Sequence, residues 1–220
     1  MSSTGFEPIA AVSLVDESHR QIKAQILSGE LPAGEALKDS VLAQKMGISR
    51  SPVREALRLL EQTGLVQKAT NRSYRVADIS VDDLDELALL RLADEGLAVR
   101  IIVQRKIPLT PLRPYLDALQ KPDAEYIELT EMDTAFHTAV VALAGLPRLS
   151  ARYAGLTDQI RLMLMTSDRG GAMSQPTLWE NHATLYEALE RAVETGDPEP
   201  ALREWERHVI LPIEALKARK

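Results

Sequence analysis

The sequence contains no cysteine, and its apolar residues never form a run long enough to span a membrane. Without cysteine there are no disulfide bonds and no thiolate chemistry, which agrees with a reducing compartment. A spanning helix needs about 20 consecutive apolar residues, and a secretory signal needs a basic flank followed by an apolar segment. The sequence has neither, so we expect a soluble cytoplasmic protein without a membrane partner.

Internal repeats and low-complexity segments are also missing, and beyond residue 78 no run of β-branched residues has the period of two that is typical of strands. Apolar residues recur there at helical spacing, with Gly- or Pro-containing breaks between the segments. Ser80 and Asp83 have the spacing of a capping box at the start of the first segment. Helices are predicted at about residues 80–105, 110–119, 124–143, 148–166, 175–194 and 198–218.

The 220 residues suffice for two domains, and the charge divides them. Residues 1–78 carry a net charge of +1 and residues 79–220 carry −7, while residues 38–75 alone have eight Lys or Arg against three acids. Lys and Arg that neutralise phosphates supply most of the sequence-independent affinity for DNA. We predict a DNA-binding domain over residues 1–78 and an antiparallel α-helical bundle over residues 79–220.

Residues 15–47 predict the first part of a helix-turn-helix domain. One helix is expected from Val15 to about Gly29. A short second helix is expected from a cap at Asp39 or Ser40 to about residue 46. Gly47 then tolerates the positive φ of a tight turn, which ends this helix.

A third helix is predicted to begin after this turn. Ser49 or Ser51 can accept hydrogen bonds from its free amides, and Pro52 suits its first turn, where an N–H is not needed. The apolar residues recur at helical spacing and are expected to face inward. They are Val53, Ala56, Leu57 and Leu60. The polar residues at its N-terminal end and outer face, Arg50, Ser51, Arg54 and Arg58, are where a recognition helix meets base edges.

Beyond Gly64 the pattern changes towards that of a β-wing. Residues 65–68 and 74–76 are short strand candidates, with a polar turn between them. Lys68, Arg72 and Arg75 give this wing a basic edge. A generic three-helix domain with a solvated charged face is the alternative interpretation of residues 38–75.

At this point the sequence resembles a known family. Residues 26–34 (ILSGELPAG) and 42–57 (LAQKMGISRSPVREAL) look like the winged helix of GntR-family bacterial transcription regulators. The resemblance implies that Arg50 and Arg54 contact operator DNA, with Lys68 and Arg72 near its backbone or minor groove. Ser40 stands where some members have a further DNA-contacting arginine, and residue 73 is serine where the wing tip is usually glycine.

Three of the four histidines lie in the predicted bundle: His137, His182 and His208. Asp133 and His137 are at i and i+4, a spacing that lets one helix offer a carboxylate and an imidazole to one metal ion. His182 and Tyr186 repeat this spacing. The alternative is that each histidine is a surface residue or a satisfied core residue.

Residues 80–217 resemble the FCD ligand-binding domain of the FadR subfamily, from Arg91-Leu92-Ala93-Asp94-Glu95 to His208. Many such domains bind a divalent metal through an Asp and three His, and Asp133, His137 and His208 match three positions. Counting back from Gly196-Asp197, the remaining histidine falls on Tyr186, with His182 one turn earlier. Either His182 or Tyr186 completes the set, or the metal is lost. We favour a bound metal.

The donor set of Asp and neutral His suits Zn, Ni or Mn. Such a cation can accept the carboxylate of a small organic acid, and Arg91 or Arg161 can add a bidentate contact. For each arginine the alternative is an ion pair within its own helix, with Glu95 for Arg91 and with Asp158 for Arg161.

We therefore expect a homodimeric transcription regulator, a repressor whose affinity for double-stranded operator DNA is controlled by a small carboxylic acid. Two alternatives remain. The bundle can serve only for dimerisation, or it can be a metal-dependent enzyme that uses Glu131 or Glu180 as its base. We do not expect an enzyme, because an enzyme would not need the basic stretch and no acid–base pair is evident beyond the candidate ligands.

Overall fold

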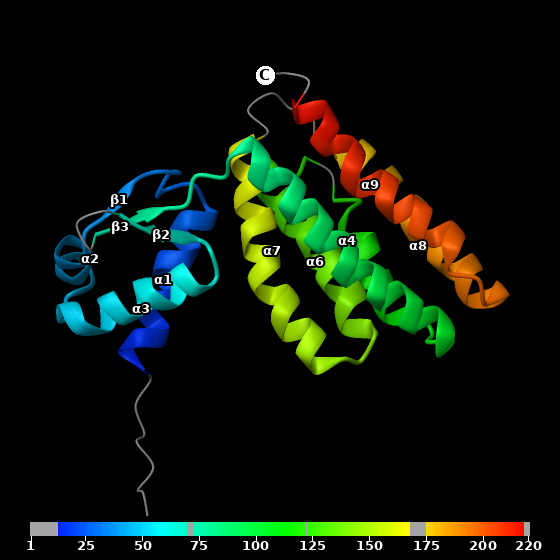
Figure 1. Ribbon diagram of the computed structural model, residues 1–220, viewed down its shortest axis with the longest axis horizontal. Helices are drawn as coiled ribbons and strands as arrows, with labels where there is room; N and C mark the ends of the chain where they lie inside the picture. Colours follow the sequence, from blue (N-terminus) through cyan, green and yellow to red (C-terminus); the bar gives the residue numbers. More distant parts are fainter. Residues whose placement is uncertain (1–12, 70–72, 122, 168–174, 218–220) are drawn as a thin grey trace, which may run out of the picture.

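The computed structural model describes residues 13–69, 73–121, 123–167 and 175–217 (Figure 1). Its N-terminal part contains three helices, α1 (Leu14–Leu27), α2 (Asp39–Met46) and α3 (Arg50–Gln62). A small antiparallel sheet completes it, with β1 (Ala36–Leu37), β2 (Val66–Lys68) and β3 (Tyr74–Val76) in the order β1-β3-β2. The predicted winged helix is confirmed, with β1 as an additional strand.

The inward face of α3 is the one predicted from its apolar spacing. Val53, Ala56, Leu57 and Leu60 are fully buried, and α1 packs against this helix. Gly47 has the expected positive φ of 66° at the turn. The packing of an amphipathic face, rather than side-chain capping, is the main source of helix stability in such a small domain.

Two capping predictions are wrong. Asp39 is the first residue of α2 instead of its cap, and the N-cap Lys38 makes no side-chain cap hydrogen bond. Ser49 does occupy the N-cap of α3, but its side chain accepts no cap hydrogen bond. The carboxylate of Asp39 is instead engaged by two arginines of α3.

The C-terminal part is an α-helical bundle. Its long helices are α4 (Val81–Gln104), α6 (Tyr126–Leu143), α7 (Pro147–Ser167), α8 (Gln175–Thr195) and α9 (Glu199–Lys217). Residues 110–119, predicted as one helix, form a 3₁₀ turn (Thr110–Leu112) and the short α5 (Arg113–Ala118). The Ser80–Asp83 capping box at the start of α4 is confirmed. No helix within the described ranges is long and apolar enough to cross a membrane.

Helix α4 organises the bundle, because α6, α7, α8 and α9 all pack against it. The bundle has its own core, in which Ile102, Leu119, Phe136, Val140 and Leu189 are completely buried.

The two parts meet where α1 lies beside α7 (Figure 1). Lys23 of α1 forms an ion pair with Asp158 of α7, with 2.6 Å between Nζ and Oδ2. Leu162 of α7 is buried among the apolar residues of the winged helix. Gly64, before β2, lies so close to Gln159 that an added Cβ would be 2.7 Å from the Gln159 Cδ. A helix of the bundle is thus packed directly against the winged helix.

Candidate DNA-binding face and buried histidine centre

Arg50 and Arg54 lie at the exposed N-terminal end of α3, with 60% and 62% of their side chains accessible. Both donate hydrogen bonds to Asp39. The Arg50 Nη2 is 2.8 Å from Oδ1, and the Arg54 Nη2 and Nε are 2.6 and 3.0 Å from Oδ2. Partial burial raises the pKa of Asp39, but the hydrogen bonds from Arg54 and Arg50 lower it by more, so the carboxylate stays ionised.

The other predicted DNA contacts that fall within the described residues lie on the same part of the molecule. Ser51 is exposed in the first turn of α3, beside the N-cap Ser49. Arg58 follows on the outer face and pairs with Glu55, with 2.6 Å between Nη2 and Oε1. Lys68 is exposed at the end of β2. Arg72 lies outside the described residues.

The second candidate site is buried in the bundle, where three helices bring four side chains together. Asp133 and His137 come from α6, His182 from α8 and His208 from α9. One ligand atom from each lies within 4.8 Å of the others. His137 and His182 are completely buried, and Asp133 is 4% exposed. The sequence-predicted Asp133, His137 and His208 thus converge, and His182 joins them.

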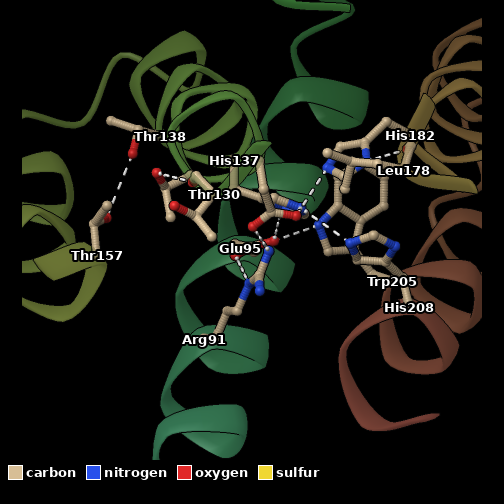
Figure 2. A network of polar contacts seen from close by, with 12 residues as sticks. Arg91, Glu95, Thr130, His137, Thr138, Thr157, Leu178, His182, Trp205 and His208 are labelled. Carbon is tan, nitrogen blue, oxygen red and sulfur yellow. Dashed lines mark hydrogen bonds and ion pairs between the residues drawn. The ribbon is translucent and has the colours of Figure 1, made fainter. Parts of the chain in front are cut away.

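Glu95 of α4 lies at the centre of the surrounding hydrogen bonds (Figure 2). Its Oε2 accepts from the Nδ1 of His137 and from the Nε1 of Trp205, both at 2.6 Å. Its Oε1 accepts from the Nε of Arg91 at 2.7 Å and from the hydroxyl of Tyr153 at 2.5 Å. One carboxylate thereby connects α4, α6, α7 and α9.

These contacts fix the proton positions on two imidazoles. Because a carboxylate and a carbonyl can only accept, His137 donates from Nδ1 to Glu95, and His182 donates from Nδ1 to the carbonyl of Leu178 at 2.7 Å. Burial lowers the pKa of His137, and that of His208 falls well below its ordinary value for the same reason. A neutral imidazole with its Nδ1 protonated has its Nε2 lone pair free, which is the form that binds metals.

The two buried carboxylates remain ionised. Burial raises the pKa of Asp133, but the positive charge of the Arg91 guanidinium lowers it by more. Burial also raises the pKa of Glu95, and its contacts with His137 and Arg91 reverse the shift. The centre therefore combines two carboxylates with the neutral imidazoles of His137 and His208 and with one guanidinium.

Several atoms of this centre have no hydrogen-bond partner among the described residues. They are the Arg91 Nη2, the Asp133 Oδ2 and the His182 Nε2. A buried polar atom without a partner costs about 1–3 kcal/mol, so the native state gains if a further group binds here. The donors, imidazole nitrogens and a carboxylate oxygen, fit a divalent ion such as Zn, Ni or Mn.

The remaining candidates have other surroundings. Tyr186 is buried, and the guanidinium of Arg113 lies 4.9 Å from its ring centre. The ion pair with Glu95, which was the alternative to a ligand contact for Arg91, is present. The alternative partner of Arg161 is wrong, because Arg161 pairs with Glu131 of α6, while Asp158 faces α1.

Sequence reasoning identified Glu95 only as the partner of Arg91. Its contacts with His137, Tyr153 and Trp205 come from other helices. Helical spacing carries no signal for contacts of this kind, so the central role of Glu95 was missed.

A winged helix with exposed arginines, joined to a bundle with a buried polar centre, defines a DNA-binding protein with a sensor domain. Residues 15–76 match the family of bacterial regulatory proteins described as the gntR family, and residues 86–210 match the FCD domain. The chain therefore belongs to the GntR-family transcription regulators that carry an FCD domain. It binds DNA through its helix-turn-helix domain, and the FCD domain binds an effector.

Two sequence relatives and one solved structure support the assignment to this family. The uncharacterized HTH-type transcriptional regulator YdhC of Bacillus subtilis is 26% identical over 79% of each chain. The HTH-type transcriptional repressor GlaR of Escherichia coli is 27% identical over 90% of this chain and 93% of its own. A crystal structure described as a GntR transcriptional regulator from Rhodococcus sp. RHA1 superposes with a TM-score of 0.82, at 21% identity over 95% of this chain and all of that chain. These matches are to regulators and not to enzymes.

Proposed function

We propose that the protein is a repressor of the FadR subfamily that binds its operator as a homodimer and releases it when a small carboxylic acid binds in the bundle. Residues 1–78 would act as the DNA-binding unit and residues 79–220 as the sensor. GlaR, which spans nearly the same length, is named a repressor. The FCD match supports an effector as the controlling ligand.

In the DNA-binding unit, Arg50 and Arg54 read bases in the major groove, supported by Ser49, Ser51 and Arg58. Their place at the exposed start of the second helix of the motif supports this assignment. Lys68 and Arg72 contact the backbone or the minor groove from the wing. These contacts orient the domain, whereas base contacts provide specificity.

The observation that supports the sensor proposal is that histidine ring nitrogens and a carboxylate oxygen of Asp133 face one another in the centre. In neutral His182 the single ring proton lies on Nδ1, which donates it to the carbonyl of Leu178, so Nε2 presents a lone pair to the Asp133 Oδ1, 3.3 Å away. The Nε2 of His137 lies 4.0 Å from the same oxygen and 3.1 Å from the Nε2 of His208. Acceptor atoms at these distances repel one another unless a cation or a shared proton lies among them.

A divalent ion, Zn, Ni or Mn, would be held by Asp133, His137, His182 and His208. Bound there, it would supply a Lewis-acidic centre that accepts the carboxylate of an effector. Glu95 holds the His137 ring in the required tautomer, as an outer hydrogen-bond partner does for a metal-bound histidine. Tyr186 is not needed as a ligand, because His182 completes a four-residue set.

Arg91 and Arg161 are the proposed contacts for the rest of the effector. Each has a buried guanidinium nitrogen without a hydrogen-bond partner among the described residues, Nη2 in Arg91 and Nε in Arg161. Arg91 lies beside the centre, with its Nη2 3.7 Å from the Asp133 Oδ2. A guanidinium in this position suits a carboxylate, since it can donate two parallel hydrogen bonds.

Effector binding would shift the population of two arrangements of the dimer, only one of which matches the operator spacing. Helix α7 can transmit this shift. Its Tyr153 is bonded to Glu95 at the centre, and its Asp158 is bonded to Lys23 of the winged helix.

The homodimer is proposed to form through α4 and α9. Leu89 and Leu97 of α4 are 64% and 43% exposed, and Leu211 of α9 is 54% exposed. A groove of about 420 Å³ runs between the two helices. Exposed apolar surface of this kind is typical of an interface, and a two-fold axis would pair the two winged helices with the two halves of a pseudo-palindromic operator.

The test is elemental analysis and thermal unfolding of the purified full-length protein with and without a chelator. Removal of the metal should lower the melting temperature by about 5–10 °C, because a ligand at 100 times its Kd adds about 2.7 kcal/mol and each kcal/mol is worth about 2–4 °C at this size. Succinate or citrate should raise the melting temperature only with metal present.

Two variants separate the ligand alternatives. His182→Ala should abolish both metal content and the chelator effect, whereas Tyr186→Phe should keep both. A metal-free protein that no added Zn, Ni or Mn stabilises would contradict the proposed site. Stabilisation by carboxylates without metal would instead support direct effector recognition by Arg91 and Arg161.

A further inference from the structure

Asp39 is the only acidic side chain paired with Arg50 or Arg54 among the described residues, and it holds both of them. Asp39 belongs to α2, so both arginines of α3 are hydrogen-bonded to a neighbouring helix. An acid on a surface that faces phosphates weakens DNA binding by simple repulsion. Its presence between the two arginines therefore requires an explanation.

We propose that Asp39 is a positioning residue for base recognition, which holds Arg50 and Arg54 ready for the operator before DNA arrives. This inference rests on the proposed base contacts of the two arginines. It assigns Asp39 no contact with DNA and makes the specificity of the protein, rather than its overall affinity, depend on this carboxylate.

Asp39 is a firm anchor. It is the first residue of α2, where the positive end of the helix dipole favours a negative charge, and only 17% of its side chain is exposed. Because α2 packs against α3, the anchor and the arginines keep the same relative position when the domain moves.

The hydrogen bonds leave the arginines competent to read a base. A guanidinium has five N–H donors, and bidentate recognition of guanine needs two of them. Arg54 donates to Asp39 from Nε and Nη2, so both hydrogens of Nη1 and the second hydrogen of Nη2 remain available. Arg50 uses only Nη2. Each side chain is thus held along one edge and presents another.

Holding these side chains in advance has a thermodynamic consequence. Long arginine side chains lose rotamer freedom when they bind, and ordering them beforehand reduces that loss. The benefit applies only when both guanidinium groups meet the correct bases. On non-specific DNA, which is held through phosphates, Asp39 contributes only its unfavourable charge. The carboxylate should therefore raise specific affinity while lowering non-specific affinity.

The test compares Asp39→Asn with wild type on two duplexes, one selected from random sequences by the wild-type full-length protein and one scrambled. An Asn side chain has a single acceptor oxygen and an NH₂ group that cannot accept, so it can hold only one arginine well. We expect Asp39→Asn to bind the selected duplex about tenfold more weakly and the scrambled duplex as well as wild type or better. Repeated selection should show relaxed base preference, and Asp39→Glu, which keeps the carboxylate, should partly restore both properties.

Glu61→Gln is the matched control, since it removes the same charge from α3 without touching either arginine. Equal melting temperatures would show that the variants are folded. If Asp39→Asn strengthens binding to both duplexes by the same factor as Glu61→Gln, the inference is wrong and Asp39 is a repulsive charge only. If wild type enriches no sequence at all, the proposed base contacts of Arg50 and Arg54 fail, and the inference fails with them.

Discussion

The two polar sites of this protein are built from similar ion pairs in opposite surroundings. At the start of α3, Asp39 joins two arginines whose side chains are about 60% exposed. In the bundle, Glu95 joins Arg91 and His137 with no exposure of its own. Water surrounds the first cluster, so guanidinium N–H groups that have no partner in the protein cost little free energy and remain available to a ligand. In the second, every unpaired atom is costly.

This difference in exposure indicates how far each site can change without affecting the fold. Because the exposed cluster is solvated, we expect a single substitution in it to leave the fold intact. The buried centre should contribute both to folding and to the proposed ligand binding, because the carboxylate that fixes the tautomer of His137 also connects four helices.

Removing both arginines of the exposed cluster should give the largest effect on function. Arg50→Ala combined with Arg54→Ala should weaken operator binding by about 2–6 kcal/mol, since each base contact is worth about 1–3 kcal/mol. Fluorescence anisotropy with the selected duplex measures the loss, and the melting temperature should hardly change. Arg191→Ala combined with Arg207→Ala removes the same charge from exposed positions of the bundle. If both double variants lost the same operator affinity, the effect of Arg50 and Arg54 would be one of net charge only, and not of base contacts.

Glu95→Gln should break the buried site and lower the free energy of unfolding by about 3–5 kcal/mol, because it removes the carboxylate that contacts the Nε of the buried Arg91 guanidinium. The amide can still accept from one neighbour, but its NH₂ group opposes one of the remaining donors. Denaturant unfolding measures the change. Glu187→Gln, which removes one partner of an exposed pair with Arg191, is the control and should change stability by less than about 1 kcal/mol. A similar stability for wild type and Glu95→Gln would contradict the central role of Glu95.

Lowering the pH should reduce the stability that the buried site contributes but leave the exposed cluster unchanged, and this effect should be smaller than the two above. The pKa values of His137 and His208 are lowered from 6.5, so below that pH the unfolded chain takes up protons that the folded protein does not. The stability present above pH 6.5 is therefore lost as the pH falls, by about 1 kcal/mol per histidine between pH 7.5 and 5.5 in metal-free protein. The pKa of Asp39 is lowered from 3.8, so its pairs stay intact over this range.

Unfolding of chelator-treated protein at several pH values measures this decline. The variant His19→Gln, in the winged helix, should retain most of it, because the buried pair is its main source. A melting temperature that is constant from pH 7.5 to 5.5 would be incompatible with neutral, buried imidazoles.

The helices could be predicted closely because glycine and proline mark their ends. The expected helix over residues 175–194 differs from α8 by one residue, and the expected helix over 148–166 differs from α7 by one residue at each end. Strand β1 has only two residues, too few for any periodicity. The cap at Asp39 was wrong because a short polar side chain can satisfy several partners, and here its contacts with two arginines decide its orientation. Nothing in the structure explains why the side chain of Ser49 accepts no cap hydrogen bond.

The candidate centre could be predicted only in part. The i, i+4 spacing brought Asp133 and His137 to one face, and Arg91 and Glu95 to another. The meeting of α6, α8 and α9 depends on how whole helices pack, which no local pattern encodes. A count along α8 favoured Tyr186, but one helical turn decides which side chain faces the centre, and in the structure His182 faces it.

Leu162 belongs to the bundle by sequence and to the winged helix by packing. The apolar interior of the DNA-binding unit therefore includes a side chain that lies more than 80 positions beyond its own last strand. A chimera that joined this winged helix to a different sensor domain would have a cavity in its core unless the new domain supplied a side chain equivalent to Leu162. Exchange of sensors among such regulators would thus be restricted to domains that carry a compatible α7 surface.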